Sequence, residues 1–197
     1  LFLESRYSLD QSLHTRGYLG ILEEMFSGAG FEVLYHQYDR RWALGGSVNF
    51  VRQRDYEKNF NHLDYKTTTG FLSFYYATPF GNFDLAVHAG KYLARDKGIT
   101  FEARRTFDSG FEIGAFFSKT DVSAAEFGEG SFDKGLTFRI PFDYFLSSHN
   151  RGAYTTVLRS MNRDGGRRLD DFGQTLWFDR RSIRLDRLID NKDRMRP

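Results

Sequence analysis

The sequence contains no cysteine among its 197 residues. This absence excludes a disulfide framework, a cysteine-based zinc site and thiol chemistry. Proline is scarce, with 3 residues, and no stretch reaches the roughly 18 consecutive apolar residues that a membrane-spanning helix requires. Neither sign of charge dominates, because 28 Lys and Arg face 26 Asp and Glu, for a net charge of +2. So close a balance does not fit a general nucleic-acid-binding protein, and no nucleic acid is expected as a partner.

Aromatic residues and glycine, by contrast, are abundant. Phe, Tyr and Trp make up 17% of the chain, and there are 19 glycines. The mean hydropathy of −0.54 is too low for a bundle of membrane helices, while 40% hydrophobic residues are too many for a disordered chain. This composition favours a large antiparallel sheet whose strands have one apolar and one polar face.

Apolar and polar residues alternate along most of the chain. Phe83, Leu85 and Val87, for example, are separated by polar or small residues. Residues two apart share one face of a strand, so this period indicates β-structure. Strands are predicted at residues 1–9, 31–38, 42–53, 65–77, 83–90, 99–104, 111–120, 132–140 and 153–160. The predicted fold class is all-β, with about 8 to 10 antiparallel strands.

The length of these strands suits a membrane barrel. Most run for about 8 to 12 residues, and a tilted strand needs about 9 to 11 to cross a bilayer. A tight turn at 108–110 contrasts with long polar connections at 54–64 and 121–130. Outer-membrane barrels have short turns on one membrane side and long loops on the other. We therefore expect an outer-membrane β-barrel, or part of a larger one.

A soluble protein is compatible with the same alternation. In a β-sandwich the apolar faces of two sheets pack together, whereas in a membrane barrel the apolar face contacts lipid. Aromatic clusters near the predicted strand ends favour the barrel, because aromatic girdles mark the two membrane interfaces. A soluble carbohydrate-binding β-sandwich is the alternative, with Tyr and Phe stacking on sugar rings. The clusters comprise Phe71, Phe74, Tyr75, Tyr76, Phe80, Phe116, Phe117, Phe142, Tyr144 and Phe145.

Two segments have helical spacing instead. Tyr18–Phe26 predicts a short helix near the N-terminus, which ends at a glycine-rich stretch. Residues 179–197 mix basic, acidic and apolar residues, which predicts either a surface helix or a frayed extension. The chain is accordingly divided into a β-barrel domain or barrel segment at 1–166 and a basic C-terminal extension at 167–197.

Catalytic and metal-binding motifs are largely missing. No phosphate-binding glycine loop occurs, and the five histidines are never three or four residues apart. We expect no cofactor and no metal. Glu126, Glu129 and Asp133 offer carboxylates of the kind that hydrolyse glycosidic bonds. We instead expect these carboxylates to be solvated in a loop or paired with Lys134. A periplasmic glycan-cleaving enzyme is the weaker alternative, and we predict no enzymatic activity.

The polar face of the predicted strands supplies the candidate site. Charged side chains in hydrocarbon are too costly unless they line water or pair with one another. A wall of both charges, without catalytic geometry, suits passing or holding a hydroxyl-rich polymer. In a small barrel, these charges could instead only cross-link a plugged interior. The candidate residues are Asp84, His88, Glu102, Arg104, Asp133 and Arg139.

The opposite face is expected to contact lipid. An Arg or Lys at the membrane midplane costs about 2 to 4 kcal/mol, whereas a position facing the interior tolerates it. Val87→Arg is therefore predicted to abolish assembly, and Ala86→Arg to be accepted. The apolar residues placed on the lipid face are Phe83, Leu85, Val87, Phe101, Leu136 and Phe138.

Five sequence blocks are more specific than any single motif. They are LEEMFSGAGFEVLY at 22–35, VRQRDY at 51–56, AGKYLARD at 89–96, FGEGSFDKG at 127–135 and RDGG at 163–166. In order and rough spacing they resemble the YjbH-type family. The resemblance covers most of the chain, from about residue 17 to about residue 170.

This resemblance implies an outer-membrane β-barrel protein of exopolysaccharide or capsule production in Gram-negative bacteria, usually made as a lipoprotein precursor and without enzymatic activity. Family members are much longer, so the chain is expected to be the C-terminal part of one, with the lipid-anchoring cysteine absent here. The expected location is the cell outer membrane. Expected partners are secreted polysaccharide, outer-membrane lipid, and other polysaccharide-export proteins or the rest of a longer barrel chain.

The polar face of the strands gives a further prediction. If its charges contact the polysaccharide, Arg104→Glu with Arg139→Glu is predicted to reduce surface or secreted polysaccharide while leaving assembly intact.

Overall fold

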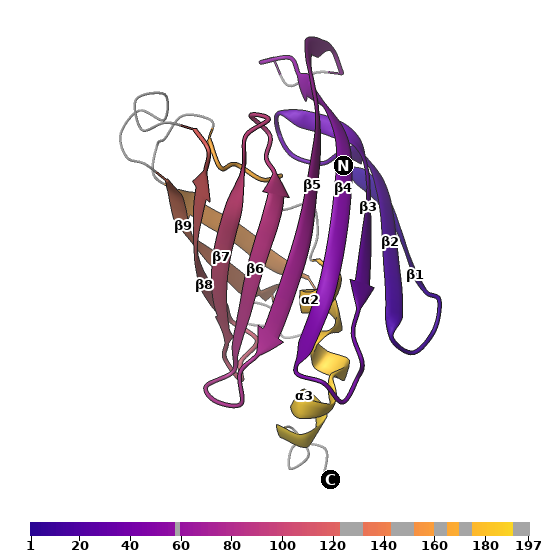
Figure 1. Ribbon diagram of the computed structural model, residues 1–197, viewed down its shortest axis with the longest axis vertical. Helices are drawn as coiled ribbons and strands as arrows, with labels where there is room; N and C mark the ends of the chain where they lie inside the picture. The colour runs from indigo at the N-terminus through magenta and orange to yellow at the C-terminus, as the bar shows by residue number, and fades with distance from the viewer. Residues whose placement is uncertain (58–59, 123–131, 143–151, 160–164, 170–174, 191–197) are drawn as a thin grey trace.

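Ten antiparallel strands form one sheet, in which each strand pairs with its neighbours in sequence (Figure 1). The computed structural model describes residues 1–57, 60–122, 132–142, 152–159, 165–169 and 175–190. The strands are β1 (Phe2–Ser8), β2 (Leu13–Ile21), β3 (Phe26–Tyr35), β4 (Trp42–Arg54), β5 (His62–Ala77), β6 (Phe83–Lys91), β7 (Lys97–Thr106), β8 (Glu112–Thr120), β9 (Asp133–Pro141) and β10 (Ala153–Arg159). The prediction of an all-β fold is confirmed.

The sheet is strongly curved, and its concave face surrounds an interior (Figure 1). Arg6 of β1 and Thr155 of β10 belong to the two edge strands, yet they line the same cavity. The described residues include no pairing between β1 and β10, so the sheet curls around the interior without closing. This single layer differs from the two packed sheets of a β-sandwich, and that alternative architecture is wrong.

The two faces of the sheet are inverted relative to those of a soluble protein. On the convex face Leu72 is 75% exposed and Phe50 is 60% exposed. On the concave face Asp84 and Arg16 are almost completely buried. Alternating burial confirms the predicted outward direction of Phe83, Leu85, Val87, Phe101 and Leu136. Phe138 is two residues after Leu136 and therefore shares its face, although burial does not alternate there.

The aromatic clusters point to both faces. Phe71 and Tyr75 are buried on the concave side, and Phe116 lines the interior cavity. The girdle prediction is wrong for these three, because consecutive residues of a strand point to opposite faces. The exposed members are Phe74, Tyr76, Phe80, Phe117 and Phe142, and Tyr144 and Phe145 lie outside the described residues.

The short helix predicted at Tyr18–Phe26 is wrong, because these residues form a β-hairpin. They contain the end of β2, a turn and the start of β3, and the amide of Leu22 donates to the Phe26 carbonyl at 3.0 Å. Tyr18, Leu22 and Phe26 are buried in one cluster, and their shared burial explains the helix-like spacing. Gly20 has a φ of 135°, which does not fit a helix.

A carboxylate stabilises the turn between β1 and β2. Asp10 accepts hydrogen bonds from the amides of Ser12 at 2.6 Å and Leu13 at 2.8 Å. These donors favour the charged carboxylate and lower the pKa of Asp10 below its usual value. The tight turn at 107–111 lies at the same end of the sheet, whereas β4 ends and β5 begins at the other end.

The C-terminal segment packs against the concave side of the sheet. It contains α2 (Leu176–Asp179), η2 (Arg180–Ile183) and α3 (Leu185–Asp190), coloured gold in Figure 1. Trp177 is completely buried and stacks on Tyr75, with ring centroids 5.4 Å apart. The helix predicted within 179–197 is confirmed at Leu185–Asp190, where Ile189 is exposed, but Arg184 and Arg187 are buried, so the segment is not a purely surface helix. The domain boundary after residue 166 stays a prediction.

The burial of Trp177 also changes what is expected at position 86. Ala86 belongs to the same buried cluster as Tyr75 and Trp177. An arginine at this position would have to displace that cluster, and overpacking of a core is destabilising. We therefore no longer expect Ala86→Arg to be accepted, although the residue does face inward.

Gly30 leaves room for a buried hydrogen bond. The Tyr18 hydroxyl donates to Asn49 Oδ1 at 2.5 Å, and a Cβ on Gly30 would overlap both groups. We expect Gly30→Ala to lower the free energy of unfolding by about 1 to 3 kcal/mol, the usual cost of overpacking. Gly17→Ala is the matched control, because nothing lies within 4 Å of a Cβ there. Thermal unfolding in detergent measures both variants, and equal midpoints would contradict this packing argument.

Candidate functional site: the cavity inside the sheet

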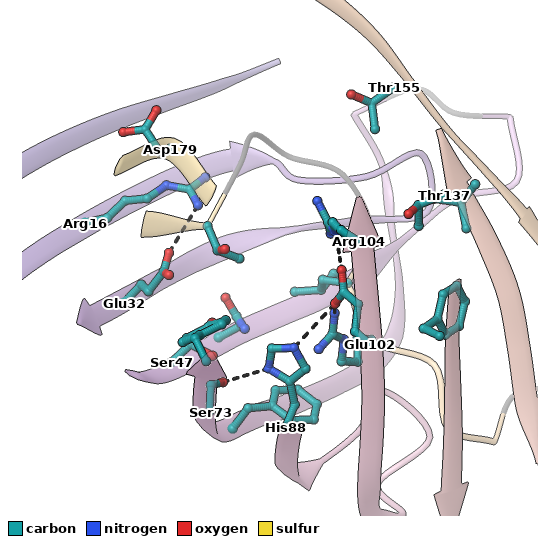
Figure 2. Close-up of a pocket in the computed structure, with 18 of the residues that line it drawn as sticks. Arg16, Glu32, Ser47, Ser73, His88, Glu102, Arg104, Thr137, Thr155 and Asp179 are labelled. Carbon is teal, nitrogen blue, oxygen red and sulfur yellow. Dashed lines mark hydrogen bonds and ion pairs between the residues drawn. The ribbon is translucent and has the colours of Figure 1, made fainter. Parts of the chain in front are cut away.

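The concave face encloses a cavity of about 590 Å³. All ten strands contribute to its lining, as do residues that follow β10. Figure 2 shows part of this lining. Arginines outnumber carboxylates, and serine, threonine and asparagine side chains lie between them. The charged lining residues are Arg6, Arg16, Arg104, Arg139, Arg159, Arg168, Glu32, Glu102 and Asp179.

His88 and Glu102 are the centre of one polar network in this cavity (Figure 2). His88 Nδ1 lies 2.8 Å from Ser73 Oγ, and His88 Nε2 lies 3.4 Å from the Glu102 carboxylate. Glu102 also accepts a hydrogen bond from Arg104 and lies 3.4 Å from Nη2 of Arg168. One buried carboxylate thus contacts two guanidinium groups and an imidazole, and these contacts compensate the cost of its burial.

The register of three strands brings this network together. Ser73 of β5 pairs directly with His88 of β6. His88 pairs with Thr100 of β7, two residues before Glu102. Because residues two apart share a strand face, Glu102 is a diagonal neighbour of His88 on the concave side.

A second network joins β1, β2 and β3. Nε of Arg16 lies 2.8 Å from Glu4, and its Nη1 lies 3.3 Å from Glu32 (Figure 2). Glu32 also accepts a hydrogen bond at 2.9 Å from the backbone amide of Leu176. The same carboxylate therefore holds a wall arginine and the first turn of α2.

In two of the ion pairs the arginine is more exposed than its carboxylate partner, whereas Arg16 is more buried than Glu32. The Glu102 side chain is 3% exposed, whereas that of Arg104 is 21% exposed. Asp133 is likewise more buried than Arg159, which lies 3.7 Å away. Each of the three carboxylates that line the cavity has an arginine partner. The surface presents many N–H and O–H donors, which can bind a hydroxyl-rich ligand.

The predicted site residues divide into two groups. Four of them line the cavity, namely His88, Glu102, Arg104 and Arg139. Asp84 accepts hydrogen bonds from Arg181 and Arg184 at 2.7 Å each, so it holds the C-terminal segment. Asp133 contacts Arg159 beneath the cavity surface. All six face the concave side, and the structure does not test their contact with a ligand.

Six charged residues of the cavity are not among the predicted site residues, namely Arg6, Arg16, Glu32, Arg159, Arg168 and Asp179. Assigning Tyr18–Phe26 to a helix removed β2 from the predicted sheet, although Arg16 alternates with buried neighbours in a period of two. Glu32 was overlooked as an inward residue of a predicted strand. Arg168 lies beyond the last strand, and no local pattern predicts its return to Glu102 at 3.4 Å.

The described residues contain no group of three or more His, Cys, Asp or Glu arranged to hold a metal ion. Within the same part of the chain, no helix is long and apolar enough to cross a membrane. Glu126 and Glu129 of the acidic loop lie outside the described residues.

A comparison with known families matches residues 1–177 to the YjbH family, described as "Exopolysaccharide biosynthesis protein YbjH". The chain belongs to this family. The match covers all ten strands and ends within α2. The resemblance carried by the five sequence blocks is confirmed.

A curated relative is "Uncharacterized lipoprotein YjbH" of Escherichia coli (strain K12), which is 40% identical over 166 residues. The alignment covers 82% of this chain and 24% of the relative, so the chain spans about a quarter of the relative's length. No solved structure matches the chain.

Proposed function

We propose that this YjbH-family chain forms part of the wall of an outer-membrane β-barrel that acts in exopolysaccharide production or export. The convex face contacts lipid, and the interior cavity holds or passes the polysaccharide without cleaving it. The observation that carries the proposal is the inversion of the sheet, with apolar side chains exposed outside and charged side chains buried inside.

The convex face is unfavourable in water and favourable in hydrocarbon. Exposed apolar area costs about 25 cal/mol per Å² in water, and contiguous apolar patches of this extent are rare on soluble monomers. Charged side chains on the concave face, by contrast, avoid lipid. The exposed apolar residues of the convex face include Leu19, Phe31, Leu44, Phe50, Leu72, Phe74, Leu85, Ile99, Phe101, Phe117, Leu136 and Leu158.

The chemistry of the cavity supports binding rather than cleavage. Its arginine, serine and threonine donors can hydrogen-bond sugar hydroxyls, and the rings of Phe71 and Phe116 offer stacking surfaces. Glu102 is compensated by Arg104 and Arg168. A carboxylate held in this way is suited to positioning its partners, and we propose that the cavity is non-enzymatic.

The two open edges of the sheet indicate a further partner. An unpaired strand edge is costly in lipid, where no water satisfies its backbone groups. The curated relative is about four times as long as the matched segment. We infer that β1 and β10 pair with other strands of the full-length protein, or of another polysaccharide-export protein.

Fractionation of cells that express the full-length protein tests the location. We expect the protein in the outer-membrane fraction, extracted only by detergent, with gel migration that changes on heating because a folded barrel resists SDS until heated. A monomer that stays soluble in plain buffer would contradict the proposal.

A matched pair of tryptophan substitutions tests the role of the cavity. Thr155 of β10 lines the cavity, whereas its neighbour Tyr154 is exposed on the convex face. We expect Thr155→Trp to reduce secreted polysaccharide several-fold by filling the cavity, with the amount of assembled protein unchanged. Tyr154→Trp should leave secretion normal. Normal secretion by an assembled Thr155→Trp variant would place the polysaccharide elsewhere.

A further inference from the structure

A band of basic side chains crosses the convex face near one end of the sheet. Strands β4 to β9 each contribute one residue. In β4, β6 and β8 this residue lies near the end of the strand, and in β5, β7 and β9 it lies near the beginning. These positions meet at the same end, because neighbouring strands are antiparallel. We call this set the basic band, and its members are Arg52, Lys66, Lys91, Lys97, Lys119 and Lys134.

The strand register places like charges directly opposite each other in this band. Arg52 pairs with Lys66 across β4 and β5, and Lys91 pairs with Lys97 across β6 and β7. Such opposed like charges destabilise a sheet. Among the described residues, one ion pair reaches the band, from Arg52 to the fully exposed Asp64 at 3.9 Å. Arg52 also donates to the Leu63 carbonyl at 2.9 Å, and Lys134 lies over the Phe132 ring. The described residues thus supply one carboxylate partner to six cationic side chains.

A groove of about 530 Å³ lies beside the band. Arg52, Lys66 and Lys91 line it together with Arg95, which donates to the backbone carbonyl of Lys66 at 2.9 Å. Arg95 has a φ of 71°, an uncommon conformation for a residue other than glycine. Phe50 of the exposed apolar face also lines the groove, so the groove lies where apolar and basic surfaces meet.

The opposite end of the convex face carries aromatic residues. The rings of Tyr35 and Trp42 lie 6.3 Å apart there, and Tyr76 pairs with Trp42 across β4 and β5. Lys66 and Tyr76 are ten residues apart on β5, close to the 9 to 11 residues with which a tilted strand crosses a bilayer. Aromatic belts lie at the level of lipid head groups, so the basic band falls at the other membrane surface.

We propose that the basic band binds the anionic phosphate groups of lipid head groups. This inference rests on the proposed membrane location and adds a binding site and a ligand class to it. A phosphate between two opposed cations replaces their repulsion with charge-assisted hydrogen bonds. The adjoining apolar face, which begins at Phe50, then contacts the acyl chains of the same lipid.

Reconstitution of the full-length protein into two kinds of vesicle tests the site. One kind contains phosphatidylcholine alone, and the other also contains anionic phosphatidylglycerol. We expect phosphatidylglycerol to raise the temperature at which heat-modifiable migration is lost. Lys66→Gln with Lys97→Gln should lose at least half of this rise, and should be no less stable than the original protein in phosphatidylcholine. Arg40→Gln with Arg105→Gln removes equal charge at the other end of the sheet and should keep the full rise.

Each contrary outcome has a separate meaning. An equal rise in the Lys66/Lys97 variant and the original protein would overturn the assignment of the site. Inorganic phosphate that reproduces the rise in phosphatidylcholine vesicles, at matched ionic strength, would show a site for a free anion instead of a lipid. A protein that enters neither kind of vesicle would contradict the proposed function and this inference with it.

Discussion

Leu136→Arg is expected to prevent the protein from assembling in the outer membrane, whereas Thr137→Arg at the next position is expected to be accepted. Leu136 lies near the middle of β9 and is exposed on the convex face, between Ala115 and Leu158 of the adjacent strands. A basic residue facing lipid costs about 2 to 4 kcal/mol at the membrane midplane and less toward the interfaces, so at Leu136, two residues from Lys134, we expect a cost near the lower end of this range. Thr137 points the other way and lines the cavity of about 590 Å³, where an arginine side chain has both space and water.

The amount of heat-modifiable protein in the outer-membrane fraction measures this difference. The two variants share a strand, a depth and a new side chain, so they differ chiefly in the face that carries the charge. Equal assembly of the two would show that the convex face does not contact lipid. This pair replaces Val87→Arg with Ala86→Arg, because Ala86 packs in the cluster that contains Trp177.

Asp84→Ala is expected to release the C-terminal segment from the sheet. The two carboxylate oxygens of Asp84 accept hydrogen bonds from Arg181 and Arg184 at 2.7 Å each, and the Asp84 and Arg184 side chains are fully buried. Removing one partner of a buried ion pair typically costs about 3 to 5 kcal/mol, because the remaining charge stays uncompensated. Most of that cost is avoided if the segment leaves the interior and its arginines become hydrated.

Limited trypsin digestion in detergent measures this release. Cleavage after Arg181 and Arg184 should be slow in the original protein and fast in Asp84→Ala, while the ten strands stay intact. Asp39→Ala is the control, because Asp39 forms a partly exposed pair with Arg40 at 3.8 Å, and such pairs contribute about 0 to 1 kcal/mol. Unchanged cleavage of the Asp84 variant would mean that other contacts hold the segment.

Alternation of apolar and polar residues predicted nine of the ten strands, because a period of two is a local property of the chain. The missing strand, β2, has the same period at His14, Arg16 and Tyr18. Its end was mistaken for a helix, because Tyr18, Leu22 and Phe26 approach one another across a hairpin turn. Helical spacing and a buried turn produce the same pattern over so few residues.

The inward direction of the candidate residues was predictable for the same reason, but their partners were not. His88 and Glu102 meet through the register of β6 and β7, which follows once the hairpin is placed. Asp84 meets Arg184 at a separation of 100 residues, and no periodicity in either segment predicts that contact. Its role in holding the C-terminal segment therefore emerges only in three dimensions.

The sequential strand order has a consequence for folding. Every pairing in the sheet joins strands that are neighbours in the chain, so each pairing closes a single connection, and the entropy cost of closing a loop grows only slowly with its length. The sheet can therefore grow one hairpin at a time, as expected for a topology dominated by local contacts. The hydrogen bonds that anchor the C-terminal segment instead join residues 97 to 144 positions apart. They require strands that are already paired, so we expect the stacking of Trp177 on Tyr75 to form late in folding.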